Sequence, residues 1–277
     1  MKRMLALMLA VAVTALAISC TKKAEETPED TAPAPQNAGA DTIMLRVVGG
    51  AADGTLVLAG KTAGEVYTLP LEGLTLYLDG SSVDASAIEN GMSAEVWYTG
   101  GVQETFPMRF TSVMAVSFSR ETDGGVYDLC GLYLRVLEDL WNADEGLNGG
   151  AQFVSVDLSC APGGLTDGEK AAVAWTFAGR HEAKCLTMTL DELREEGYLA
   201  AEKLKDGSTA YSFPEGLLFT IAPDDGAEEE NASAPTVCFR AEKWRSPLGA
   251  YFFSGCQAVC TEDGRWNGYS IGMEAIS

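Results

Sequence analysis

The chain has 277 residues, of which 47% are apolar and 21% charged, and its 40 acidic against 19 basic side chains give a net charge of −21. This composition can bury a core in one large domain or two modest ones, which excludes wholesale disorder and a polytopic membrane protein. The negative charge also makes nucleic acid and anionic lipid surfaces poor partners, because both would repel the folded chain.

The N-terminus predicts export from the cytoplasm. Met1-Lys2-Arg3 is a short basic opening, and sixteen apolar or small residues follow over Met4–Ser19, just before Cys20. A helix that spans a membrane needs about 20 such residues, so this stretch is too short to cross. A basic opening followed by a short apolar stretch is instead typical of a secretory signal.

The end of this signal resembles the lipobox of bacterial lipoproteins. Leu16-Ala17-Ile18-Ser19 precedes Cys20, with Ala17 standing where leucine is the commoner residue. The resemblance implies cleavage before Cys20, attachment of lipid to its thiol, and an extracytoplasmic location on the bacterial membrane. The alternatives are an ordinary signal peptide with an incidental cysteine and an uncleaved anchor. Residues 1–20 are therefore predicted to be a lipoprotein signal peptide, with the membrane as a partner through the lipid.

Residues 21–41 are predicted to be a disordered tether. The segment Thr21–Ala40 shows no apolar periodicity and contains Pro28, Pro33 and Pro35, so it has little surface to bury. A flexible coil of this length spans ~25 Å and would hold a folded body clear of the membrane. Because the body is acidic, the lipid has to supply the attachment, for which two acyl chains suffice.

A strand-rich domain is predicted over residues 42–121. Leu74, Leu76 and Leu78 occupy alternate positions, and glycine-rich turns separate short apolar runs along the segment. This two-residue period and close spacing favour a small barrel or sandwich. The stretch Ala87–Val96 is similar to the step from loop through glycine to strand in OB-like barrels, and this resemblance implies an OB-like fold. The predicted strands are Ile43–Val48, Thr55–Ala59, Glu65–Leu69, Leu74–Leu78, Ala94–Tyr98 and Met114–Phe118.

An α+β domain is predicted over residues 122–277. Apolar residues recur every three or four positions from Leu129 to Trp141, and the capping boxes Thr166–Glu169 and Thr189–Glu192 open two further helices. Helices that come first and antiparallel strands that come last indicate an α+β pattern and not a βαβ one. This order resembles the NTF2-like fold, whose curved sheet and helices enclose a cone. The predicted strands are Phe153–Leu158, Leu217–Ile221, Thr236–Trp244, Tyr251–Cys260 and Trp266–Met273.

Six cysteines remain beside Cys20, and all lie in the second predicted domain. An even number in an exported domain permits disulfides in fifteen connectivities, and buried free thiols are the alternative. On one strand Cys256 and Cys260 would lie ~13 Å apart, too far to bridge each other or to share a zinc ion. Because no C-x-x-C pair exists either, we expect no metal site. We also expect no cofactor. The cysteines available for disulfides are Cys130, Cys160, Cys185, Cys238, Cys256 and Cys260.

Three further motifs have plain structural explanations. Gly268–Gly272 matches G-x-S-x-G, but a nucleophile elbow needs a following helix and a later histidine, and only five residues follow. The one histidine, His181, comes four residues after Phe177 at the end of a predicted helix, where an imidazole favourably caps a C-terminus. The acidic run Asp224–Glu230 lacks the ligand spacing of a calcium loop and is predicted to be a solvated hairpin loop.

One triplet is a candidate ligand site. Lys243, Trp244 and Arg245 place two cations around an indole in an otherwise acidic chain, and a guanidinium beside an aromatic surface suits a carboxylate or a phosphate. The alternative, which we favour, pairs Arg245 with an internal Asp or Glu. In either case Lys243 is expected to be a flexible ammonium at a strand end.

No catalytic constellation accompanies these motifs. Through Lys243–Ser246 and Gly249–Phe253, the region from Tyr127 onward is similar to uncharacterised lipoproteins of Gram-positive gut bacteria, a resemblance that implies no activity. We predict a lipid-anchored envelope protein that acts as a binding or interaction module, with a small molecule, a glycan or a protein as its partner. The alternatives are a cell-surface hydrolase that uses two carboxylates and a purely structural or inhibitory module.

Overall fold

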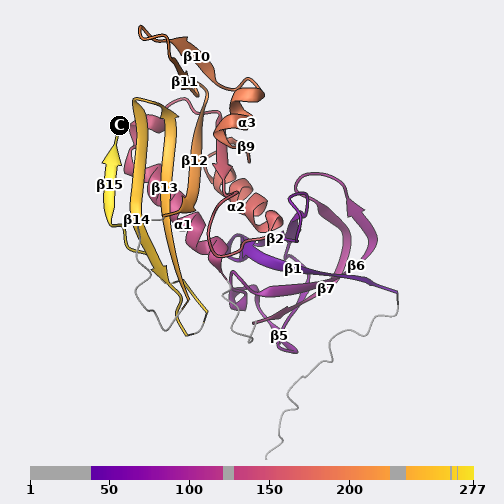
Figure 1. The fold of residues 1–277 in the computed structure, drawn as a ribbon. Coiled ribbons are helices and arrows are strands. Elements are labelled where there is room, and N and C mark those ends of the chain that lie inside the picture. The colour runs from indigo at the N-terminus through magenta and orange to yellow at the C-terminus, as the bar shows by residue number, and fades with distance from the viewer. Residues whose placement is uncertain (1–38, 121–127, 225–234, 263, 267) are drawn as a thin grey trace, which may run out of the picture. The chain divides into compact units, whose positions relative to one another are not determined.

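The computed structural model describes residues 39–120, 128–224, 235–262, 264–266 and 268–277. The predicted signal peptide with Cys20, most of the predicted tether and most of the acidic run Asp224–Glu230 lie outside these residues. Within them the fold is α+β, as predicted, with a strand-rich sheet in the N-terminal part and a second sheet whose main strands follow the helices (Figure 1). No helix in this part of the chain is long and apolar enough to cross a membrane.

The N-terminal sheet has seven strands in the order β3-β2-β1-β6-β7-β4-β5. Neighbouring strands are antiparallel, except that β4 pairs in parallel with β7. All six predicted strands are present, and β5 is a short strand that the sequence did not indicate. The strands are β1 (Asp41–Gly49), β2 (Thr55–Ala59), β3 (Val66–Pro70), β4 (Thr75–Leu78), β5 (Ser81–Val83), β6 (Ser93–Gln103) and β7 (Arg109–Ser119).

The N-terminal sheet encloses its own apolar core. Leu56, Leu58 and Val96 are fully buried in it, at the alternate positions that a strand directs to one face. An isolated bridge between Tyr67 and Met108 brings β3 to the start of β7, so the sheet folds back toward its own edge. No ladder among the described strands joins the two edge strands β3 and β5, and a closed barrel is not shown.

The C-terminal sheet has six strands in the order β15-β14-β13-β12-β8-β9. The last four strands of the chain are antiparallel, as predicted. The placement of the last strand is wrong, because the predicted strand Trp266–Met273 shares only Met273 with β15. Among the described residues before Met273, Ser270 pairs with β14, in an isolated bridge to Gln257. The strands are β8 (Phe153–Asp157), β9 (Lys184–Leu186), β12 (Gly216–Pro223), β13 (Thr236–Ser246), β14 (Gly249–Val259) and β15 (Met273–Ile276).

One prediction about connectivity is wrong. β8 runs parallel to both β12 and β9, and helix α2 (Asp167–Arg180) comes between β8 and β9 along the chain. The three elements therefore form a βαβ unit, and the sheet is mixed. The sequence did not indicate β9, because it has three residues and Cys185 and Leu186 are only half-buried. A strand this short has no recognisable alternation of apolar and polar residues.

Two helices cover one face of the C-terminal sheet (Figure 1). Helix α1 (Leu129–Ala143) buries the apolar stripe that the sequence predicts, and Leu132 and Leu137 have no exposed surface. Helix α2 begins at the predicted capping box, in which the Thr166 hydroxyl accepts from the Glu169 N–H and the Glu169 carboxylate accepts from the Thr166 N–H. The apolar stripe of α1 and the start of α2 are therefore as the local sequence predicts.

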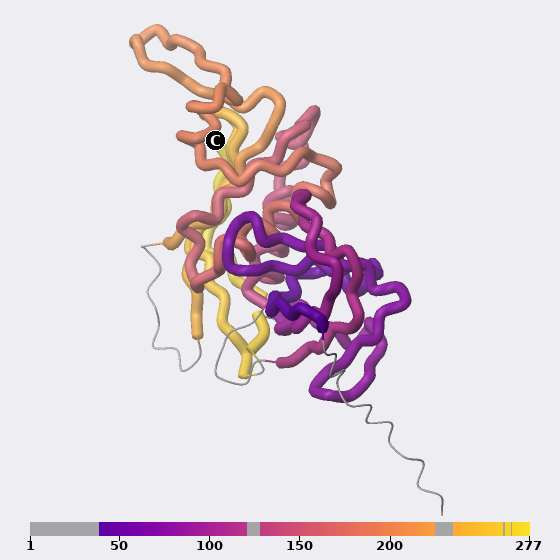
Figure 2. Tube along the Cα trace, turned by 90° about the vertical axis from the view of Figure 1, so that its right-hand side faces the viewer, coloured from indigo at the N-terminus to yellow at the C-terminus, as the bar shows by residue number. Residues whose placement is uncertain are grey.

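The opposite face of this sheet is covered at one end only. There Leu193 and Phe213 pack over Leu218 of β12 in a small separate cluster. A two-stranded hairpin in the covering segment stands out from the rest of the fold (Figures 1 and 2). No helix of the described residues lies over the remainder of this face, on β12, β13 and β14. The covering elements are α3 (Leu190–Glu195), β10 (Ala200–Lys203) and β11 (Thr209–Ser212).

Helix α2 also contacts the N-terminal sheet. The Thr166 hydroxyl donates to the carbonyl of Gly60 at 3.0 Å, and the N–H of Gly168 donates to the carbonyl of Lys61 at 3.4 Å. Gly168 allows this approach because a Cβ at that position would overlap the Gly60 carbonyl.

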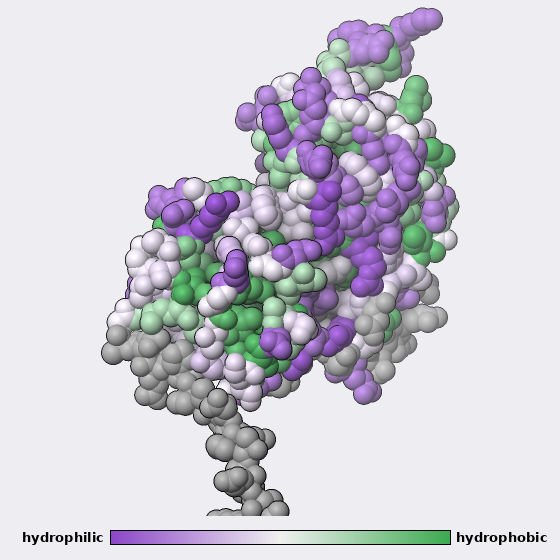
Figure 3. All heavy atoms as spheres, turned by 180° about the vertical axis from the view of Figure 1, so that it is seen from behind, coloured by the Kyte–Doolittle hydropathy of each residue, from purple (hydrophilic) through white to green (hydrophobic). Residues whose placement is uncertain are grey.

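Seen from behind, apolar side chains gather on the N-terminal part of the fold, whereas the C-terminal part is largely hydrophilic (Figure 3).

Candidate functional site

The first cation of the predicted ligand triplet is buried. Lys243 has no exposed surface, and its ammonium donates to Trp141 O at 3.1 Å, Asp144 O at 2.7 Å and Asn148 Oδ1 at 3.2 Å. Trp141 lies in the last turn of α1 and Asp144 is its C-cap, where free carbonyls attract a cation. Burial lowers the pKa of the Lys243 ammonium to about 8. The prediction of a flexible ammonium at a strand end is therefore wrong.

Arg245 is half-buried and also has partners within the fold. Its Nη1 donates to Leu147 O and Gly149 O, both at 2.7 Å, and its Nη2 donates to Pro214 O at 2.6 Å. Among the described residues, no carboxylate lies within ion-pair distance of its guanidinium. The internal partners are thus three carbonyl oxygens, instead of the Asp or Glu that the sequence suggested. Together Lys243 and Arg245 fasten the segment after α1 to β13.

Trp244 faces the other side of the sheet from these two cations. Successive side chains of a strand point to opposite faces, and the half-buried indole of Trp244 packs with the cluster of Leu193, Phe213 and Leu218. The three side chains of the triplet therefore do not converge on one surface. The side chains of Lys243 and Arg245 are already bonded to oxygens of the fold. Ligand binding by the triplet stays a prediction.

The six cysteines of the folded part are free thiols in the structure. Burial raises the pKa of Cys185 to about 11 and that of Cys256 to about 12, which keeps both thiols protonated and unreactive. Cys256 and Cys260 belong to one apolar core without bridging each other, as their spacing predicts. Cys130, Cys256 and Cys260 are buried, Cys185 and Cys238 are half-buried, and Cys160 is exposed.

Ser270 and His181 lie apart, in separate structural roles. Ser270 makes an isolated bridge with Gln257 and is followed by strand β15, where a nucleophile elbow would need a helix. His181 is the C-cap of α2, as predicted. Its ring stacks on Trp141 with 3.8 Å between centroids, and its Nε2 lies 3.0 Å from Glu138 Oε2. These contacts tie the end of α2 to α1.

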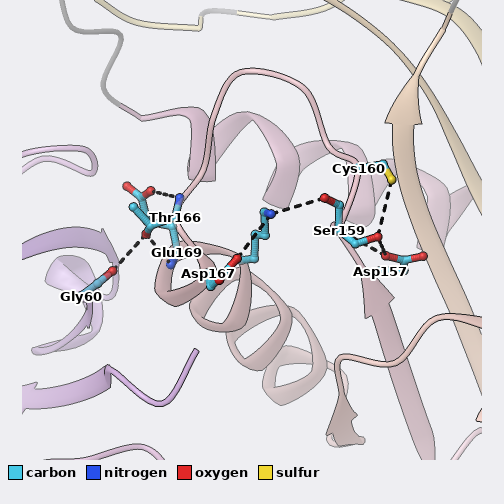
Figure 4. A network of polar contacts seen from close by, with 8 residues as sticks. Gly60, Asp157, Ser159, Cys160, Thr166, Asp167 and Glu169 are labelled. Carbon is cyan, nitrogen blue, oxygen red and sulfur yellow. Dashed lines mark hydrogen bonds and ion pairs between the residues drawn. The ribbon is translucent and has the colours of Figure 1, made fainter. Parts of the chain in front are cut away.

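A polar network connects the end of β8 with the start of α2 (Figure 4). The Ser159 hydroxyl donates to Asp157 Oδ1 at 2.6 Å, Lys170 Nζ donates to Ser159 O at 3.4 Å, and Cys160 Sγ lies 3.7 Å from the Ser159 hydroxyl. His181 lies at the opposite end of α2, about 20 Å away for a helix of this length. No imidazole therefore reaches Ser159 to act as its base, and the network serves to hold the loop.

The pocket beside this network, of about 330 Å³, has charged groups that are already paired. Asp157 accepts from Ser159, and Lys170 lies 3.5 Å from Asp167 Oδ1. Glu192 accepts the N–H of Thr189 in the capping box of α3. No group of three or more His, Cys, Asp or Glu side chains in the described part of the chain is placed to hold a metal ion. This pocket therefore offers few free groups to a ligand.

A groove of about 340 Å³ lies on the uncovered part of the sheet face, over β12, β13 and β14. Thr220, Glu242 and Phe252 form one row across these strands, because Glu242 pairs with Thr220 on one side and with Phe252 on the other. Arg240 and Ser254 lie next to the row. The lining residues are Thr220, Arg240, Ala241, Glu242, Phe252, Phe253 and Ser254.

The two charged side chains of this groove are unpaired within the described residues. Burial raises the pKa of Glu242, and the nearby Arg240 guanidinium partly offsets the rise. Perturbed carboxylates in clefts are candidates for functional sites. Sequence reasoning missed both residues, although the alternation along β13 carried the signal: Val237, Phe239 and Ala241 face the core, so the residues between them face away.

No family model, curated protein or solved structure matches the chain. Its function therefore has to be argued from its N-terminal sequence and from the groove on the C-terminal sheet.

Proposed function

We propose that the protein is a lipid-anchored component of the bacterial envelope that acts outside the cytoplasm as a binding module. The observation that carries this proposal is the N-terminal sequence, in which a basic opening and the apolar stretch Met4–Ser19 lead to Cys20. The proline-containing segment Thr21–Ala40 supports it, since an anchored protein needs a spacer between lipid and fold. The acidic composition supports it too, because the folded part has no electrostatic affinity for an anionic leaflet.

The anchor is tested by Cys20→Ala with Cys160→Ala as the matched control, because Cys160 is an exposed thiol of the folded part. The Cys20→Ala protein should be released to the medium or remain unprocessed, since lipid is the only attachment proposed. Labelled fatty acid should be incorporated into the Cys160→Ala protein and not into the Cys20→Ala protein. A cleaved Cys20→Ala protein that still sediments with membranes would overturn the proposal.

A binding role is supported by the groove over β12, β13 and β14. A hydrolase of the two-carboxylate kind needs a second acid about 5–9.5 Å from the first, whereas Glu242 is the one carboxylate among the described residues that line this groove. Two hydroxyl groups and an aromatic ring line the groove beside Arg240 and Glu242. A concave site uses a few polar groups placed in this way to fix the orientation of a ligand.

The finer fold assignments are also proposals. We propose that the N-terminal sheet is OB-like, supported by the bridge between Tyr67 and Met108, and that the C-terminal part is NTF2-like, supported by helices on one face of a sheet that ends in antiparallel strands. An experimental structure in which β3 forms a continuous ladder with the segment around Met108 would support the first assignment. An open sheet at that edge would exclude it.

A further inference from the structure

Two opposite charges share the groove on the uncovered part of the sheet face, without a partner in the described part of the chain. Arg240 and Glu242 are two residues apart on β13, so both side chains point to the same face with their Cα atoms ~7 Å apart. Arg240 is exposed, whereas Glu242 is half-buried. A half-buried charge without a partner is costly. An ammonium group brought to Glu242 would relieve this cost, and the exposed guanidinium of Arg240 next to it is open to a carboxylate.

The neighbours of this pair provide contacts for the rest of a ligand. Phe252 is directly opposite Glu242 on β14 and remains half-buried, so part of its ring is available to an apolar group. Thr220 on the other side and Ser254 nearby supply hydroxyls that can donate or accept hydrogen bonds. The groove volume of about 340 Å³ lies at the small end of ligand sites. It suits a molecule with two charged groups and one apolar side chain.

We propose that this groove binds a small zwitterion, with its amine at Glu242, its carboxylate at Arg240 and an apolar side chain against Phe252. The inference rests on the binding role proposed above and names the ligand class for it. A planar guanidinium receives a carboxylate in a fork of two hydrogen bonds, and the Glu242 carboxylate accepts from an ammonium. A free amino acid and a short peptide both present these groups.

Calorimetric titration of the full-length protein in detergent with phenylalanine tests this inference. N-acetylphenylalanine lacks the ammonium and phenylalaninamide lacks the carboxylate, so each should bind at least tenfold more weakly than phenylalanine. The dipeptide Gly-Phe keeps both charges but separates them, and its affinity relative to phenylalanine decides between a peptide and a free amino acid. Absence of binding by phenylalanine and Gly-Phe at 10 mM, or equal binding of the three phenylalanine compounds, would overturn the inference.

Substitutions assign the site to the groove. Glu242→Gln and Arg240→Gln should each weaken phenylalanine binding at least tenfold, and Glu202→Gln on the exposed strand β10 should leave it unchanged. Binding that all three variants retain equally would place the ligand elsewhere and overturn the inference. If a groove variant fails to fold, the three phenylalanine compounds still decide the matter on the unaltered protein. Since the anchor is tested by Cys20→Ala in cells, either proposal can fail while the other stands.

Discussion

Replacing Lys243 with methionine tests whether a buried ammonium holds the end of α1 against β13. Methionine is unbranched and nearly as long, so it fills the same space. It cannot donate to Trp141 O, Asp144 O or Asn148 Oδ1, the three oxygens that the ammonium now satisfies. Because the Lys243 side chain has no exposed surface, water does not readily replace the lost donors.

Two opposing contributions set the expected loss at pH 7. The variant loses three hydrogen bonds from a charged group, at ~1.5–3 kcal/mol each, or ~6 kcal/mol together. Asn148 Oδ1 loses its donor, whereas Trp141 O still accepts from Asn148 Nδ2 and Asp144 O from the N–H of Leu147. Removing the ammonium also recovers the cost of burying its charge. The pKa of Lys243, which burial lowers from 10.5 to about 8, corresponds to a cost of ~3 kcal/mol. We therefore expect Lys243→Met to lower the free energy of unfolding by ~3 kcal/mol.

The dependence on pH has a definite sign. The pKa of Lys243 in the folded chain, about 8, is below its unfolded value of 10.5, so the unfolded chain binds more protons between these values. The contribution of this group to stability therefore rises with pH over that interval, by up to ~1.4 kcal/mol per pH unit. Methionine does not titrate, so the stability gap between wild type and variant should widen. Burial raises the pKa values of Tyr133 and Tyr269, which affects both proteins alike and cancels in the difference.

Urea unfolding followed by circular dichroism at pH 7, 8.5 and 9.5 measures this difference. Lys205→Met is the matched control, because Lys205 is exposed and an exposed substitution changes stability by within ~0.5 kcal/mol. A Lys243→Met protein as stable as the control, with a gap that stays constant across these pH values, would refute the reasoning from a buried ammonium.

Two further substitutions test the start of each long helix. Gly168→Ala adds a Cβ that would overlap the Gly60 carbonyl and should destabilise the protein by ~1–3 kcal/mol. The control Gly179→Ala, in the same helix, meets no atom within 4 Å and should stabilise the protein by up to ~1 kcal/mol. Equal thermal stability of the two variants would contradict the contact between Gly168 and Gly60. Burial raises the pKa of Asp128 from 3.8 to about 6 while its carboxylate accepts the N–H of Gly131, so the folded chain binds more protons over that interval and Asp128 costs stability as pH rises through it. The asparagine side chain of the Asp128→Asn variant can still cap α1. In urea unfolding this variant should be more stable than wild type by up to ~3 kcal/mol at pH 7 and nearly equal to it at pH 4. The opposite dependence on pH would contradict the raised pKa of Asp128.

Local patterns in the sequence determined the elements whose stabilising contacts are themselves local. The capping boxes at Thr166 and Thr189 located the starts of α2 and α3, because each box is closed by bonds between residues three positions apart. The stripe from Leu129 to Trp141 likewise predicted α1. Apolar residues spaced three and four positions apart lie on one face of a helix, and that face packs against a core. The proposed N-terminal anchor signal is likewise inferred from residues that are neighbours along the chain.

Tertiary structure alone decided which strands pair and where the charged side chains of β13 point. The parallel pairing of β8 with β12 joins segments that are far apart along the chain, and a run of apolar residues is compatible with either direction of pairing. The alternation along β13 divides its side chains between two faces, but only the position of α1 makes one face the interior. Lys243 is buried for that reason, with acceptors 95 to 102 residues away. Arg240 and Glu242 are left on the other face, on the part that α3 and the hairpin do not cover.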